Sequence, residues 1–137
     1  MLTKTRIFTA LLTTALLPAG AQAHHSFAAE FALDKPVHIE GSVVLMEWVN
    51  PHSWLHIDMT QEDGTVVRWK VEGGAPSALL RRGWNRNSLP AGTKVIVDGF
   101  QARDGSLRAN ARDIQFPDGR ILNLGSSNRE TAPPATP

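Results

Sequence analysis

The sequence predicts an all-β fold with one short helix, arranged as an OB-like small Greek-key barrel. From residue 37 onward, apolar side chains recur at every second position, and turn signals rich in glycine, proline and acidic residues separate these segments. The one good helix-forming segment falls between the third and fourth strands, where an OB-like barrel has its helix. A β-sandwich is the alternative architecture.

Five segments have the alternation expected of strands. In order they are VHIEGSVVLMEW, WLHIDM, TVVRWKVE, KVIVDGF and LRANARDIQF. Gly41 is expected at a bulge or bend in the first, and Leu55, Ile57 and Met59 on one face of the second. Asn50-Pro51 marks the turn between those two, and PDG followed by RILNL extends or closes the sheet. The helix is expected to begin at Pro76 and to include SALLRR.

Residues 1–23 have the pattern of a secretory signal peptide. Lys4 and Arg6 precede an apolar run, and Ala21-Gln22-Ala23 is a small-x-small cleavage site. We therefore expect a periplasmic or secreted protein that is cleaved near Ala23. The apolar run is shorter than a bilayer span, so no membrane span is expected after cleavage, and an uncleaved N-terminal anchor is the alternative.

The rest of the chain divides into three parts. Residues 24–36 form an N-terminal arm with three apolar anchors, residues 37–125 form the OB-like domain, and residues 126–137 form a disordered tail that lacks large apolar side chains. The anchors of the arm are Phe27, Phe31 and Leu33.

Composition excludes some classes of function. Without Lys4 and Arg6 the chain has 12 basic and 13 acidic residues, a formal charge of −1, which argues against nucleic acid as a partner. The chain has no cysteine, so an exported domain of about 110 residues must be stabilised by its core alone. No nucleophile elbow, P-loop or H-E-x-x-H motif is present, and the sequence favours a binding function over an enzymatic one.

The leading candidate site is the pair of histidines that follows the predicted cleavage site. The α-amine and the imidazole of His24 would chelate one metal ion, and this nitrogen-rich donor pair suits copper(II). His25 can ligate in its place. Because four residues of regular strand separate their Cα atoms by about 13 Å, only one of His52 and His56 is expected to join. His52, beside the turn, is favoured, and a solvated histidine pair without function is the alternative.

A second candidate site is an aromatic and arginine-bearing face. Trp48, Trp54 and Trp84, together with Arg81 and Arg82, can form a surface that binds an envelope protein or a glycan without a metal. Two interpretations stay open for these residues. The tryptophans can instead be core and rim packing, and the arginines an ordinary solvated surface, since aspartates are interspersed with the later arginines.

Four stretches together resemble a family of small exported bacterial proteins of unknown function. These are HHSFAAEF, EWVNPHSWLHID, LLRRGWNRNSL and KVIVDGFQARDGS. The resemblance covers nearly the whole chain after the signal and implies an exported β-rich single domain, but it assigns no activity to any residue. We therefore expect a periplasmic copper-binding module, with a metal-free envelope interaction domain as the alternative; the oligomeric state is left open.

Overall fold

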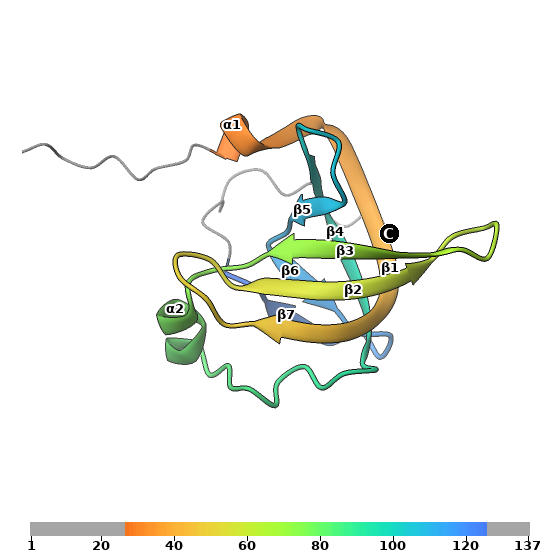
Figure 1. Cartoon of the computed structure of the whole chain (residues 1–137). Coiled ribbons are helices and arrows are strands. Elements are labelled where there is room, and N and C mark those ends of the chain that lie inside the picture. Colours follow the sequence, from red (N-terminus) through yellow and green to blue (C-terminus); the bar gives the residue numbers. More distant parts are fainter. Residues whose placement is uncertain (1–26, 126–137) are drawn as a thin grey trace, which may run out of the picture.

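A computed structural model describes residues 27–125, which contain two short helices and seven strands (Figure 1). The helices are α1 (Phe27–Glu30) and α2 (Pro76–Arg81). The strands are β1 (Phe31–Glu47), β2 (Trp54–Thr60), β3 (Val66–Glu72), β4 (Lys94–Ala102), β5 (Arg108–Asn110), β6 (Asp113–Gln115) and β7 (Ile121–Asn123). The predicted all-β fold, with a short helix between the third and fourth strands, is confirmed. The predicted signal peptide, double histidine and tail lie outside the described residues.

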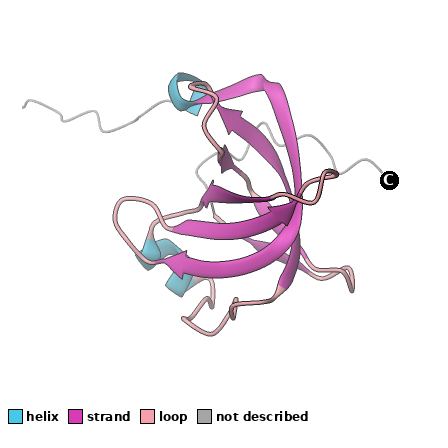
Figure 2. Ribbon diagram, turned by 45° about the vertical axis from the view of Figure 1, so that its right-hand side comes forward, coloured by secondary structure: helices cyan, strands magenta, loops and turns pink. Residues whose placement is uncertain are grey.

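The seven strands belong to one sheet in the order β1-β2-β3-β5-β4-β6-β7. A further pairing between β1 and β4 closes the first five strands into a ring, and Figure 2 shows the strands curving around its interior. All pairings are antiparallel except that of β3 with β5, which is parallel. A closed ring agrees with the OB-like prediction, whereas a β-sandwich would divide the strands between two facing sheets.

β1 is 17 residues long because it pairs with two neighbours. Residues 36–42 pair with β4, and residues 42–47 pair with β2. The strand begins at Phe31. The alternation of side chains indicates a later start, because residues 33–36 are all exposed and do not alternate. The bulge lies between Val43 and Leu45 rather than at Gly41. A side chain at Gly41 would collide with the backbone of β2, so the glycine is explained by close approach.

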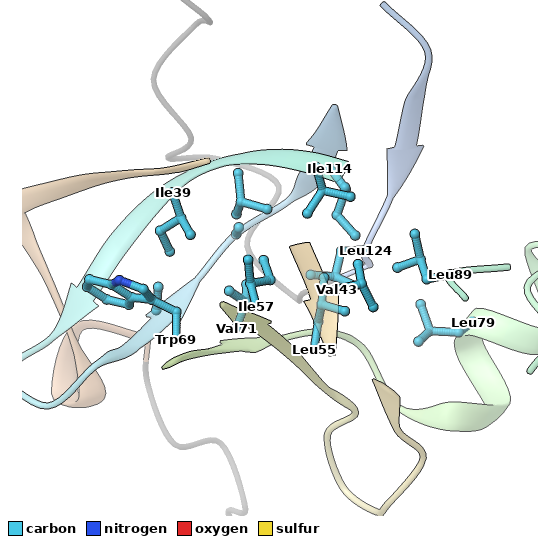
Figure 3. Packing of buried hydrophobic residues seen from close by; sticks show 14 of the residues in the cluster. Ile39, Val43, Leu55, Ile57, Trp69, Val71, Leu79, Leu89, Ile114 and Leu124 are labelled. Atoms are coloured by element: carbon cyan, nitrogen blue, oxygen red, sulfur yellow. The ribbon is translucent and has the colours of Figure 1, made fainter. Parts of the chain in front are cut away.

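The main core fills the ring. Figure 3 shows its packing, with Trp69 toward one end and Leu79 and Leu89 toward the other. Of the three residues predicted on one face of β2, Leu55 and Ile57 are fully buried and Met59 is partly buried against the core. Leu79 carries α2 into the same cluster.

A smaller cluster of aromatic residues lies apart from the main core. Phe31, Phe100 and Ala102 are buried in it, and Phe27 of α1 packs against them. The ring of Phe27 stacks on Phe31 at 5.5 Å between centroids and meets the edge of Phe100 at 5.9 Å. α1 is therefore held against β1 and β4 by aromatic contacts, while Leu33, the third predicted anchor, is exposed.

Candidate functional site

The site begins where the chain passes from β1 into β2. The Asn50-Pro51 peptide bond in this turn is cis. Beyond it, the Ser53 amide donates a hydrogen bond to the Gly74 carbonyl at 3.0 Å, and the Gly73 amide donates to the Ser53 carbonyl at 2.8 Å. These bonds continue the antiparallel pairing of β2 and β3 past the ends of both strands. His52 is thereby held next to the C-terminal end of β3.

His52 lies beside a buried carboxylate at this position. Its Nδ1 is 3.5 Å from Oε1 of Glu72, which is within ion-pair distance, but the contact does not form a hydrogen bond. Glu72 is 6% exposed, whereas the side chain of His52 is 34% exposed. The imidazole therefore directs a buried nitrogen toward the carboxylate and leaves part of its ring accessible to solvent.

Glu72 lies between two neighbouring strands of the sheet, β2 and β5. In the parallel pairing of β3 with β5, Asn110 is its register partner, and the Asn110 side-chain amide donates a hydrogen bond to Oε1 at 3.2 Å. Burial raises the pKa of Glu72, and the negative charge of Glu30 adds to this, whereas His52, Asn110 and Arg108 oppose the increase. Glu30, at the end of α1, therefore lies within electrostatic range of the carboxylate.

α1 is connected to this part of the ring through β4 and β5. Asn110 pairs with Phe100 as well as with Glu72, and Phe100 contacts the ring of Phe27. In Figure 1, α1 lies above β5. The turn before β2 and the end of β3 therefore meet at the site, while α1 lies beyond β5.

His56 belongs to a different cluster, on the outer face of the sheet. Its Nε2 is 3.3 Å from Oε1 of Glu47, and the other oxygen of that carboxylate lies 3.0 Å from Nζ of Lys70. Lys70 also lies over the ring of Trp54, at 5.1 Å from its centroid. The Lys70 ammonium lowers the pKa of Glu47, and His56 adds to the effect while burial opposes it. His52 and His56 thus have separate carboxylate partners.

Metal-ligating side chains do not gather into one group in the described part of the chain. Within residues 27–125, no three histidine, aspartate or glutamate side chains are placed to hold one metal ion. The other predicted ligands, His24 and His25, precede the described part. A centre that uses His52 would therefore have to take further donors from outside residues 27–125.

Sequence reasoning did not select Glu72 or Asn110 as site residues. The alternation in TVVRWKVE puts Glu72 on the face opposite Val71 and Trp69, which signals an outward carboxylate. Its burial depends on β5, whose parallel pairing with β3 joins segments that are far apart in the chain. No local pattern in the sequence predicts the contact between Glu72 and β5.

The residues of the predicted aromatic and arginine-bearing face are divided in the structure. Trp84 is 3% exposed and its indole N–H donates to the Asn123 carbonyl at 3.0 Å, so it is a core residue with no free ring face. Trp48 packs edge-on against it at 6.4 Å between centroids. Trp54 lies on the outer face of β2. Arg81 and Arg82 are exposed at the end of α2.

Comparison with known proteins gives a family but no activity. Residues 12–111, most of the chain, match the model of a family of unknown function, DUF6152. The chain belongs to this family. The predicted membership of an uncharacterised family is thus confirmed, and the matched part includes His52, Glu72 and β1 to β5. No curated protein and no solved structure matches the chain significantly. In the described part, helices of the length and apolar character needed to cross a membrane are absent.

Proposed function

We propose that this protein is an exported, periplasmic module that binds and handles copper between its N-terminal histidine and His52. The observation that carries the proposal is the setting of His52: a partly exposed imidazole beside a buried carboxylate, whose pKa is also affected by Glu30 at the end of the helix that follows the double histidine. The signal-peptide pattern of residues 1–23 supports export.

The length of the arm supports the same arrangement. His24 precedes Phe27 by three residues, so its Cα is at most about 10 Å from that of Phe27. Phe27 is packed on Phe31 and Phe100, next to the strand that holds Asn110. Packing of α1 therefore limits how far the amine and imidazole of His24 can move from His52 and raises their effective concentration there.

The donor chemistry fits copper(II). The amine and imidazole of His24 with the imidazole of His52 give three nitrogen donors, which suit a tetragonal copper site. Glu72 would hold Nδ1 of His52 and leave Nε2 for the metal, and its negative charge would favour a bound cation. His25 takes the role of His24 if cleavage occurs one residue later, and His56 is the substitute for His52.

Binding is proposed in preference to turnover because the sequence lacks the common nucleophile, phosphate-binding and metalloprotease motifs. The test starts with the intact mass of protein exported by its native host. A chain that begins at His24 should bind one copper(II) ion with a nitrogen-rich electron paramagnetic resonance spectrum. An additional alanine before His24, or His52→Ala, should weaken binding at least roughly 10–100-fold, since changes outside the ligand shell already have effects of that size.

The matched control is His38→Ala. His38 is an exposed histidine whose Nδ1 is hydrogen-bonded to Asp98 at 2.6 Å, and we expect its removal to leave copper affinity unchanged. His56→Ala distinguishes the substitute ligand from His52. A native terminus other than His24 or His25, or unchanged affinity in the extended and His52→Ala variants, would contradict the proposal.

A further inference from the structure

The segment around α2 carries an uncompensated positive charge. From Gly73 to Val97 the chain has no aspartate or glutamate but has four basic residues, all of them exposed. These are Arg81, Arg82, Arg86 and Lys94. The rest of residues 27–125 has seven basic and 12 acidic residues. The protein is therefore electrically polarised although its overall charge is close to zero.

Ion pairing distinguishes four arginines of the described chain from three others. The four lie on an aspartate: Arg68 on Asp58, Arg108 on Asp104, Arg112 on Asp113 and Arg120 on Asp118. Within the described part of the chain, Arg81, Arg82 and Arg86 have no carboxylate partner, and the guanidinium of Arg82 lies against Gly125. The aspartates that neutralise the later arginines thus do not neutralise the three at and after the end of α2.

Exposed apolar side chains accompany these arginines. Leu80, beside Arg81, is 56% exposed, and Val49 in the loop between β1 and β2 is 47% exposed. The contact between Trp48 and Trp84 holds this loop against the segment that follows α2. Leu80, Arg81, Arg82 and Arg86, here called the α2 surface, are all exposed, and Figure 1 shows α2 at the periphery of the molecule.

We propose that the α2 surface binds membranes rich in anionic phospholipid, with the arginines contacting headgroup phosphates and Leu80 entering the interface. Charge complementarity and the adjacent apolar side chain favour this partner. A cavity of about 590 Å³ lies between β1, β2 and β4, and no residue of the α2 surface lines it. The proposal is independent of copper binding.

The expected strength of membrane binding follows from the electrostatic attraction between the arginines and the anionic lipid. Each basic residue close to an anionic leaflet strengthens binding roughly fivefold, so the three arginines together contribute roughly 100-fold. This attraction is screened over about 10 Å at 0.1 M salt and must weaken as salt is added. Insertion of one leucine is much less sensitive to salt.

The experiment measures co-sedimentation of the exported protein with vesicles of pure phosphatidylglycerol or pure phosphatidylcholine at low ionic strength. We expect binding to the anionic vesicles only, lost on addition of salt. Joint replacement of Arg81, Arg82 and Arg86 by glutamine should weaken it roughly 100-fold, and Leu80→Ser should weaken it without changing its salt dependence.

The matched control replaces three paired arginines, Arg68, Arg108 and Arg120, by glutamine and removes the same formal charge. This variant should retain most of the binding, and circular dichroism should show that both triple variants are folded. Equal binding to the two lipids, an equal loss in both triple variants, or capture of an acidic protein or polysaccharide without binding to phosphatidylglycerol would overturn the proposal.

Discussion

Among single residues, Glu72 is in an environment that differs strongly from that of a free side chain. Its carboxylate is buried between β2 and β5, with one hydrogen bond from Asn110 and an ion-pair contact with His52. A buried carboxylate is costly unless it is paired, and such groups commonly persist where they serve a site. Glu72 therefore stabilises the fold less than a neutral residue of its shape would.

The pH dependence of stability follows from the direction of this shift. A carboxyl group whose pKa is raised by folding contributes most to the free energy of unfolding when the pH is below its pKa in the unfolded chain. This contribution is lost as the pH rises through its pKa in the folded protein. Burial raises the pKa of Glu72 above 4.5, so wild-type stability should fall as the pH rises above that value. In metal-free protein, Glu72→Gln should unfold at higher urea concentration than wild type at neutral pH and at the same concentration well below pH 4.5. A destabilised variant at neutral pH would show that the ionised carboxylate is well compensated.

The sequence predicts the surroundings of some residues of the site but not of others. His52 was selected because it follows a proline turn, and the structure places it beside a buried carboxylate. Glu72 could be assigned to an outward face, but not to burial, because its register partner in β5 comes from a distant segment of the chain. Trp84 could not be distinguished from a surface tryptophan, since its core position depends on contacts with Trp48 and β7.

At the scale of elements, β1 determines how the ring closes. It leaves its pairing with β4 and joins β2 around Ser42, which pairs with both Lys94 and Asp58. The alternation of side chains indicated the strands and their inner faces, as in β2. The alternation did not locate the bulge, because glycine occurs both at bulges and at close backbone contacts. Gly41 lies at a close contact with the backbone of β2.

A substitution at Gly41 tests this account. A Cβ at that position would meet the backbone oxygen of Asp58 and would lie 2.7 Å from Cγ2 of Ile57, so β1 and β2 would have to separate. Gly41→Ala should destabilise the protein by about 1–3 kcal/mol, the range for overpacking. The control is Ser42→Ala at the neighbouring position, which removes only an exposed hydrogen bond with Lys94 and should change stability little. Denaturant titrations of both variants measure the difference, and equal stability would show that the strands can separate freely.

For the whole molecule, the order of the elements predicted the closed, OB-like arrangement, but not the residues that pair to form it. Local patterns gave three strands, a helix and two strands, and the last predicted strand is divided into β5 and β6 in the structure. The pairings of β1 with β4 and of β3 with β5 join distant segments, and no residue pattern encodes their register directly. The pairing of β3 with β5 also brings Asn110 to Glu72, the carboxylate beside His52.

The two apolar clusters should contribute unequally to global stability. Leu55 is fully buried in the main core, and Leu55→Ala should cost about 2–5 kcal/mol. Phe27 is only partly buried in the smaller cluster, so Phe27→Ala should cost less than the roughly 3–5 kcal/mol of a fully buried phenylalanine. Urea denaturation followed by tryptophan fluorescence measures both losses.

The two apolar clusters should also differ in their effect on copper affinity. If α1 carries the N-terminal histidine to His52, Phe27→Ala should weaken copper binding in protein that is still folded, because the arm loses its anchor. A partly buried residue in the main core is the control: Met59→Ala lowers stability away from the arm and should leave copper affinity unchanged. If both variants weaken copper binding equally, the effect reflects general loosening of the ring. If Phe27→Ala binds copper as wild type does, α1 does not position the metal-binding end of the chain.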